Sequence, residues 1–156
     1  MRDLSALGAQ SFDVVYDAYA INFVPDAGVV FDQVRRVIRP GGLYRVYFAN
    51  PFSWGFDESD WNGQGYNLSK HYRSGAGESN SPEYWDFTDL DGVKQKLEAP
   101  RDFNHALSAV FNGLIGRGFS LQGLWEVEAL DLNAAPGSWE HMQLVMPQWL
   151  IVWARG

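Results

Sequence analysis

The order of hydrophobic and polar residues predicts a strand, a helix and a second strand within the first 50 residues. Residues 12–16 are a short run of β-branched and aromatic side chains between polar neighbours, as in a buried strand. Val30, Val34 and Val37 then recur at helical spacing on one face. Residues 43–48 form another apolar run. This order is typical of a parallel β-α-β unit, and we expect ligands at the carboxyl ends of such strands.

Both ends of the predicted helix over residues 26–39 carry recognisable signals. Asp26 follows a proline and is a suitable N-cap, because its carboxylate can accept a hydrogen bond from the first free backbone N–H groups. Pro40, Gly41 and Gly42 follow the last apolar positions, and glycine readily supplies the positive φ that often ends a helix.

Residues 51–100 show no clear periodicity until residues 90–97. The segment is rich in glycine, serine, asparagine, tryptophan and tyrosine. A long irregular insertion within a domain is usually functional or disordered, and the many aromatic side chains argue against disorder. We therefore expect a lid whose aromatic rings cover the carboxyl ends of the strands near Tyr16 and Phe48.

The remaining residues predict one more helix and two more strands. Apolar side chains lie on one face of a helix over residues 103–117, with glycines at its end. Residues 119–128 and 148–154 are the two strand candidates. We expect a single domain over residues 1–156.

Composition excludes several classes of protein. The 156 residues carry a net charge of −7 without a basic run, which is unfavourable for binding a nucleic-acid backbone. The absence of cysteine excludes disulfides and thiolate sites. No apolar run has the length of a membrane span and no signal peptide opens the chain, so we expect a soluble, cytoplasmic protein.

Three stretches together resemble the second half of a class I S-adenosylmethionine-dependent methyltransferase. They are Ser11-Phe12-Asp13-Val14-Val15, Val24-Pro25-Asp26 and Arg36-Val37-Ile38-Arg39-Pro40-Gly41-Gly42. The nearest match is the small-molecule branch that includes ubiquinone- and menaquinone-biosynthesis-like enzymes. The resemblance implies a partial Rossmann-like α/β sheet in three α/β/α layers. Its strands would be mostly parallel, with the last one an antiparallel insertion near the edge.

The resemblance also implies a cofactor and a set of site residues. It implies S-adenosylmethionine, with Asp3 and Leu4 on the adenine side and Asp17, Ala18 and Tyr19 on the methionine and ribose side. The glycine-rich cofactor loop of the family is absent, since Gly63-Gln64-Gly65 neither follows a strand nor opens a helix. The chain is thus expected to be the C-terminal, truncated portion of such a domain. Asp3 can equally be an ordinary surface carboxylate.

The acceptor side has its own candidates. Asn22 and Phe23, in the loop after the first strand, and Tyr72, in the lid, are the expected substrate-binding residues. His105, and less strongly His71, are the candidate catalytic bases for an oxygen or nitrogen nucleophile. A histidine beside an apolar face is more often a structural hydrogen-bonding group. Three isolated histidines and no paired acidic motif predict no metal site.

Two functions follow from these observations. The first is methyl transfer from S-adenosylmethionine to a small-molecule acceptor. The alternative is a non-catalytic methyltransferase-like remnant that acts through association. In either case the strand near Phe12–Tyr16 should have an unpaired edge with no lysine or proline to protect it, so we expect a homodimer through this strand.

Overall fold

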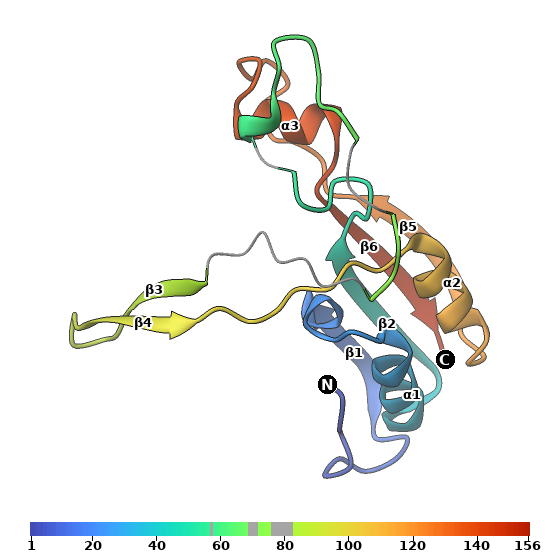
Figure 1. Ribbon diagram of the computed structural model, residues 1–156. Helices are drawn as coiled ribbons and strands as arrows, with labels where there is room; N and C mark the ends of the chain where they lie inside the picture. Colours follow the sequence, from blue (N-terminus) through green and yellow to red (C-terminus); the bar gives the residue numbers. More distant parts are fainter. Residues whose placement is uncertain (57, 69–71, 76–82) are drawn as a thin grey trace.

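The architecture is a four-stranded sheet with two helices on one face and an extended hairpin. The computed structural model describes residues 1–56, 58–68, 72–75 and 83–156 (Figure 1). In chain order the elements are β1 (Phe12–Ala18), η1 (Ala20–Phe23), α1 (Ala27–Val37), β2 (Ile38–Ala49), η2 (Glu58–Asp60), β3 (Tyr84–Thr88), β4 (Lys94–Glu98), α2 (Leu107–Ile115), β5 (Ser120–Glu126), α3 (Trp139–Val145) and β6 (Trp149–Arg155).

The main sheet has the strand order β1-β2-β6-β5. β1 and β2 are parallel, whereas β6 is antiparallel to both of its neighbours. β1, β2 and β5 therefore run in the same direction, and β6 is inserted one place from the β5 edge. The predicted mostly parallel sheet with an antiparallel last strand near the edge is confirmed.

The hydrophobic core lies between one face of the sheet and the helices α1 and α2. Val30 and Val34 of α1 are fully buried, as the helical spacing predicted. They pack in one cluster with Val110 and Leu114 of α2 and with Tyr44, Val46 and Phe48 of β2. We call this covered side of the sheet its inner face.

The turn from α1 into β2 depends on two glycines. The helix ends at Val37, two residues earlier than predicted, because Ile38 is already extended. Gly41 has a φ of +80°, which L-residues rarely adopt. A Cβ on Gly42 would lie 2.9 Å from the carbonyl oxygen of Asp13, so this position has no room for a side chain.

The helix predicted from residue 103 begins only at Leu107. The backbone before it makes long-range hydrogen bonds instead of helical ones. The Phe103 N–H donates to the Asn22 carbonyl at 2.7 Å, and the Asn104 carbonyl accepts from the Gly75 N–H at 2.9 Å. Backbone hydrogen bonds thus hold residues 103–106 against the loop after β1 and against the lid segment.

Besides the short 3-10 turns, two elements were not predicted from sequence. One is α3, which begins at Trp139 after its N-cap Ser138, whose hydroxyl oxygen accepts a hydrogen bond from the His141 N–H. The other is the antiparallel hairpin β3–β4, which extends away from the sheet (Figure 1). Tyr84, Trp85 and Phe87 are exposed on this hairpin, so the prediction that the aromatic residues of the lid pack over the strand ends is wrong for these three.

The second face of the sheet, which we call the outer face, is only partly covered. Among the described residues its helical contact is at one end, where Trp139 of α3 packs against Trp149. By the strand register and side-chain alternation, the outer face includes Val14, Tyr16, Ala18, Arg45, Tyr47, Trp125, Trp149, Ile151 and Trp153. The second helical layer of an α/β/α sandwich is not seen in the described part of the chain.

Within the same ranges, no helix has the length and apolar character needed to cross a lipid bilayer.

Candidate functional site

The carboxyl end of β1 leads into a strained residue, Tyr19. Its φ of +75° lies in the left-handed region, which is uncommon for a residue other than glycine and often accompanies a functional constraint. The ring contacts Phe23 and Tyr47, with ring centroids 5.6 and 6.2 Å apart. Burial and the nearby charge of Asp102 raise the pKa of the Tyr19 phenol. Tyr19 is therefore a neutral hydrogen-bonding group at neutral pH.

Asp17 is buried beneath this turn. One carboxylate oxygen accepts a hydrogen bond from the Ala20 N–H at 2.7 Å, and the other accepts from the Tyr44 hydroxyl at 3.1 Å. Burial raises the pKa of Asp17, and these hydrogen bonds only partly offset that effect. Both oxygens are engaged within the chain, so the geometry gives Asp17 a structural role in shaping the turn. Its predicted contact with the cofactor has no support from this arrangement.

The first residues of the chain lie near the same end of β1. The charge of the Met1 amino group favours the ionised forms of both Asp3 and Asp17. The exposed Asp3 carboxylate accepts from the Ser5 N–H at 2.8 Å, which lowers its pKa. Leu4 is held against α1 by a 3.1 Å hydrogen bond from its N–H to the Gln33 side chain. Leu4 is thus tied to α1, and the Met1 amino group lies within electrostatic range of Asp17.

Asn22 and Phe23 have contrasting environments. Asn22 is fully buried, and its side chain donates to the Phe103 carbonyl at 3.0 Å and accepts from the Ala49 N–H at 3.0 Å. Asn22 therefore joins the loop after β1 to the end of β2 and to the segment before α2. Phe23 is partly exposed, with its ring edge-on to Tyr19, and its predicted role in binding an acceptor stays a prediction.

His105 is buried, with 1% of its surface exposed. Its Nε2 lies 2.8 Å from the carbonyl oxygen of Ile21, so Nε2 carries the proton and donates it to this carbonyl. Burial lowers the pKa of His105, which keeps the ring neutral at neutral pH. In this geometry His105 holds the η1 loop in place.

The described part of the lid caps the start of α2. The Tyr72 hydroxyl accepts from the Leu107 N–H at 3.0 Å, and the Ser74 hydroxyl accepts from the Ala106 N–H at 2.8 Å. The Tyr72 ring stacks on Phe52, with centroids 4.8 Å apart. Tyr72 is partly exposed beside these contacts, which suits a substrate-side residue. The other lid candidate, His71, lies outside the described residues.

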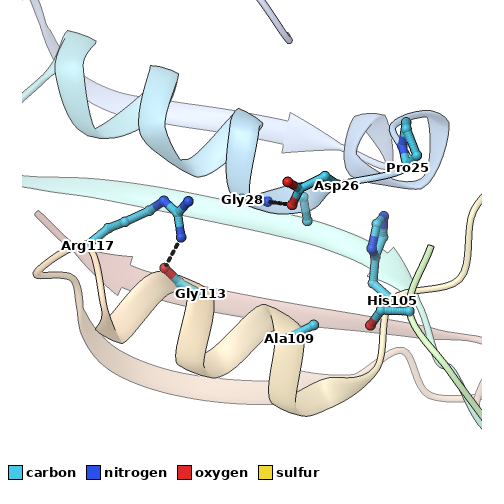
Figure 2. A pocket seen from close by; sticks show the side chains of 9 residues that line it. Pro25, Asp26, Gly28, His105, Ala109, Gly113 and Arg117 are labelled. Atoms are coloured by element: carbon cyan, nitrogen blue, oxygen red, sulfur yellow. Dashed lines mark hydrogen bonds between the residues drawn. The ribbon is translucent and has the colours of Figure 1, made fainter.

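A cavity of about 160 Å³ lies between α1 and α2. Figure 2 shows His105 and Arg117 at its two ends and Asp26 beside the start of α1. Asp26 caps that helix through the Gly28 N–H, and Arg117 forms a two-bond ion pair with Asp32. Pockets for drug-sized ligands are usually about 300–1,000 Å³, so this cavity is too small for a nucleoside cofactor.

Sequence reasoning missed two polar residues in the segment before α2. Asn104 is 1% exposed, and within the described ranges neither its amide oxygen nor its amide nitrogen has a hydrogen-bond partner. Asp102 lies close enough to Tyr19 to raise the pKa of its phenol. The only signal was an alternation of polar and apolar residues, Asp102-Phe103-Asn104-His105, just before a helix.

The amino-terminal part of the chain matches a known family. Residues 1–46 match the family model for a methyltransferase domain. The chain is also 30% identical, over 128 residues, to the uncharacterized methyltransferase YbaJ of Bacillus subtilis. That alignment covers 81% of this chain and 47% of the relative. The chain therefore spans about half the length of this relative.

Solved structures with the same fold extend over nearly the whole chain. An S-adenosylmethionine-dependent methyltransferase from Mesorhizobium loti aligns with a TM-score of 0.59 and 18% identity, over 96% of this chain and 64% of that protein. A putative S-adenosylmethionine-dependent methyltransferase from Listeria monocytogenes aligns with a TM-score of 0.64 and 14% identity, over 99% and 65%. The α/β fold predicted from sequence is the fold of these proteins.

Proposed function

We propose that this chain is part of a class I S-adenosylmethionine-dependent methyltransferase and takes part in methyl transfer from this cofactor to a small-molecule acceptor. Residues 1–46 match the family model for a methyltransferase domain, which supports the proposal. The observation that carries the proposal is the carboxyl end of β1. There the strained Tyr19 follows the exposed Ala18. Ligands of parallel α/β sheets bind at this end of the strands.

The residues present fit one wall of a cofactor site. Ala18 is exposed and offers a surface without a bulky side chain, and the Tyr19 phenol is neutral. The exposed Asp3 carboxylate can accept hydrogen bonds from an amine or hydroxyl group. Asp17 does not fit, because both of its oxygens are already engaged. When bound, S-adenosylmethionine supplies a methyl group on a positively charged sulfonium.

The contribution of this chain to the reaction is mainly positioning. Methyl transfer requires the acceptor atom to be held in line with the methyl carbon. The exposed rings of Phe23 and Tyr72 lie on the acceptor side and can hold an apolar molecule there. We assign His105 to positioning rather than to proton transfer, because its proton is held by the Ile21 carbonyl in a buried site.

Calorimetric titration with S-adenosylhomocysteine tests this proposal. We expect measurable binding to the wild-type chain and loss of that heat in Ala18→Trp, which fills the space at the end of β1. Ala135→Trp, at another exposed alanine, should bind like wild type. Absence of heat at millimolar ligand in the wild type would favour the non-catalytic alternative. Equal heats in all three proteins would show that the ligand binds elsewhere.

The proposal extends to the assembly of the protein. β1 is an edge strand, and Phe12, Val14 and Tyr16 are exposed on it. An exposed apolar edge strand favours pairing with another chain. We therefore include a homodimer through this strand, and a cytoplasmic location, in the proposed function.

A further inference from the structure

The hairpin β3–β4 has one apolar face and one polar face. Trp85 pairs with Leu97 and Phe87 pairs with Gln95 in its register, so these side chains share one face, which we call the arm face. Tyr84, Asp86 and Lys96 belong to the opposite face. All five residues of each strand are exposed. The hairpin is therefore amphipathic, and no described part of its own chain covers its apolar side.

A hairpin of this kind is not expected to be stable alone. Two isolated strands are marginal in water, and such a unit needs further packing on its apolar face. Trp85, Phe87 and Leu97 each keep close to half of their surface exposed. Because the hairpin extends away from the sheet, no described part of the same chain supplies this packing (Figure 1).

The outer face of the sheet also has aromatic side chains that no described part of the chain covers. Tyr16 is 62% exposed and Trp125 is 49% exposed, although both belong to strands of the main sheet. Trp125 lies flat over Gly123, where an added Cβ would be 2.4 Å from the indole. The outer face therefore leaves aromatic side chains uncovered, and a second layer of β-structure would pack on them at the usual separation of about 10 Å.

Charge complements shape between these two surfaces. The Arg45 guanidinium lies over the Tyr16 ring, 4.5 Å from its centroid, in the middle of the outer face. Among the described residues its Nη1 is buried without a hydrogen-bond partner. Residues 83–98 carry five carboxylates and two lysines. Glu83 lies at the base of the hairpin and, by alternation, on the same side as Trp85, where it can meet this guanidinium.

We propose that two copies of the chain exchange hairpins, so that the arm face of each copy packs on the outer face of the other. This inference rests on the proposed homodimer and names the element that covers its exposed strand. The occupant of each surface is a second copy because one chain carries both complementary surfaces. In a dimer with a twofold axis, both arm faces and both outer faces are then covered.

The area available is sufficient for a stable dimer. Aromatic side chains bury about 150–250 Å² each, so three half-exposed side chains on either surface offer roughly 300 Å². The dimer has two such contacts, and each contact buries one arm face and one outer face. The surface removed from water would be on the order of 1,200 Å² in total, which is the lower limit for specific interfaces.

Sedimentation equilibrium at micromolar concentration tests the exchange. We expect the wild type at twice 17.6 kDa and the arm variant Trp85→Ser/Phe87→Ser as a monomer, with a dissociation constant raised at least about 100-fold. Tyr84→Ser is the matched control, because Tyr84 is an equally exposed aromatic residue on the opposite face of the same strand. It should remain dimeric. Circular dichroism verifies that each variant is folded.

Mixing two defective variants tests reciprocity. The face variant Tyr16→Ser/Trp125→Ser should be monomeric alone. Mixed with the arm variant at protein concentrations well above those used for the wild type, it should form a weaker heterodimer, because one intact arm then meets one intact outer face and half of the interface is kept.

Three results would overturn the inference. A dimer that survives in the arm variant would refute the exchange while leaving a dimer through β1 in place. A monomeric wild type would refute both. Absence of a heterodimer in the mixture would refute the arm-to-face contact. Binding of S-adenosylhomocysteine is measured separately, so failure of the methyl-transfer proposal is recognised independently.

Discussion

At the scale of single residues, exposure and hydrogen bonding separated the candidates that sequence had grouped together. Ala18, Phe23 and Tyr72 are exposed enough to meet a ligand, whereas Asp17 and Asn22 are buried with their polar atoms engaged. Asn22 and Phe23 lie in the loop after β1, as predicted, whereas Asp17 and Ala18 are the last two residues of the strand itself. Position in the sequence could not indicate which side chains turn inward, because that depends on partners such as Tyr44 and Ala49, which are remote in sequence.

The structural role of Asp17 predicts a specific dependence of stability on pH. The folded state raises the pKa of Asp17 above its ordinary value of 3.8, so the folded chain holds this proton more tightly than the unfolded chain. Between those two pKa values, the free energy of unfolding falls as the pH rises. The wild type should therefore gain stability relative to Asp17→Asn as the pH is lowered from neutral towards 4. The slope should be at most about 1.4 kcal/mol per pH unit, which corresponds to one proton.

Urea unfolding of both proteins across this pH range measures the difference. Asp91→Asn, at an exposed aspartate, serves as the control and should give no comparable slope against the wild type. A difference between wild type and Asp17→Asn that stays constant with pH would contradict the buried geometry of Asp17.

At the scale of elements, periodicity predicted the helices and strands of the main sheet but not all of their ends. α1 and the strands β1, β2, β5 and β6 appear where expected, because their apolar spacing coincides with burial in the core. α2 begins later than predicted because the backbone before it bonds to Asn22 and Gly75. The hairpin β3–β4 was missed because its apolar face has no partner within the described chain.

The α1–β2 turn gives a prediction at this scale. Gly41→Ala places a side chain at a φ of +80° and should lower the free energy of unfolding by about 1–2 kcal/mol. The added Cβ would have no atom within 4 Å, so conformational strain alone accounts for the loss. Gly65→Ala is the matched control, since Gly65 also has open space but no positive φ, and it should be close to neutral. Equal effects of the two substitutions on thermal unfolding would contradict this explanation of the turn.

At the scale of the whole molecule, the described helices α1 and α2 cover only one face of the sheet. The inner face is buried under α1 and α2, while the outer face and the hairpin present aromatic side chains to solvent. The resemblance stated from sequence agrees with the family model over residues 1–46 and with the 30% identical relative, and the solved structures share the fold. The identity of the acceptor could not be predicted from it, and the expected homodimer stays a prediction, because both depend on surfaces and insertions rather than on the β-α-β pattern.

The most direct test of the proposed function is to locate the cofactor product on the chain by NMR. S-adenosylhomocysteine titrated into the ¹⁵N-labelled protein should shift the backbone amide signals of Asp3, Ala18 and Tyr19 in fast exchange. A dissociation constant on the order of a millimolar, or about −4 kcal/mol, is the affinity expected of one wall of a site. No shifts at 10-fold higher ligand, on the order of ten millimolar, or shifts confined to the cavity near Arg117, would contradict the assignment of the cofactor to the carboxyl end of β1.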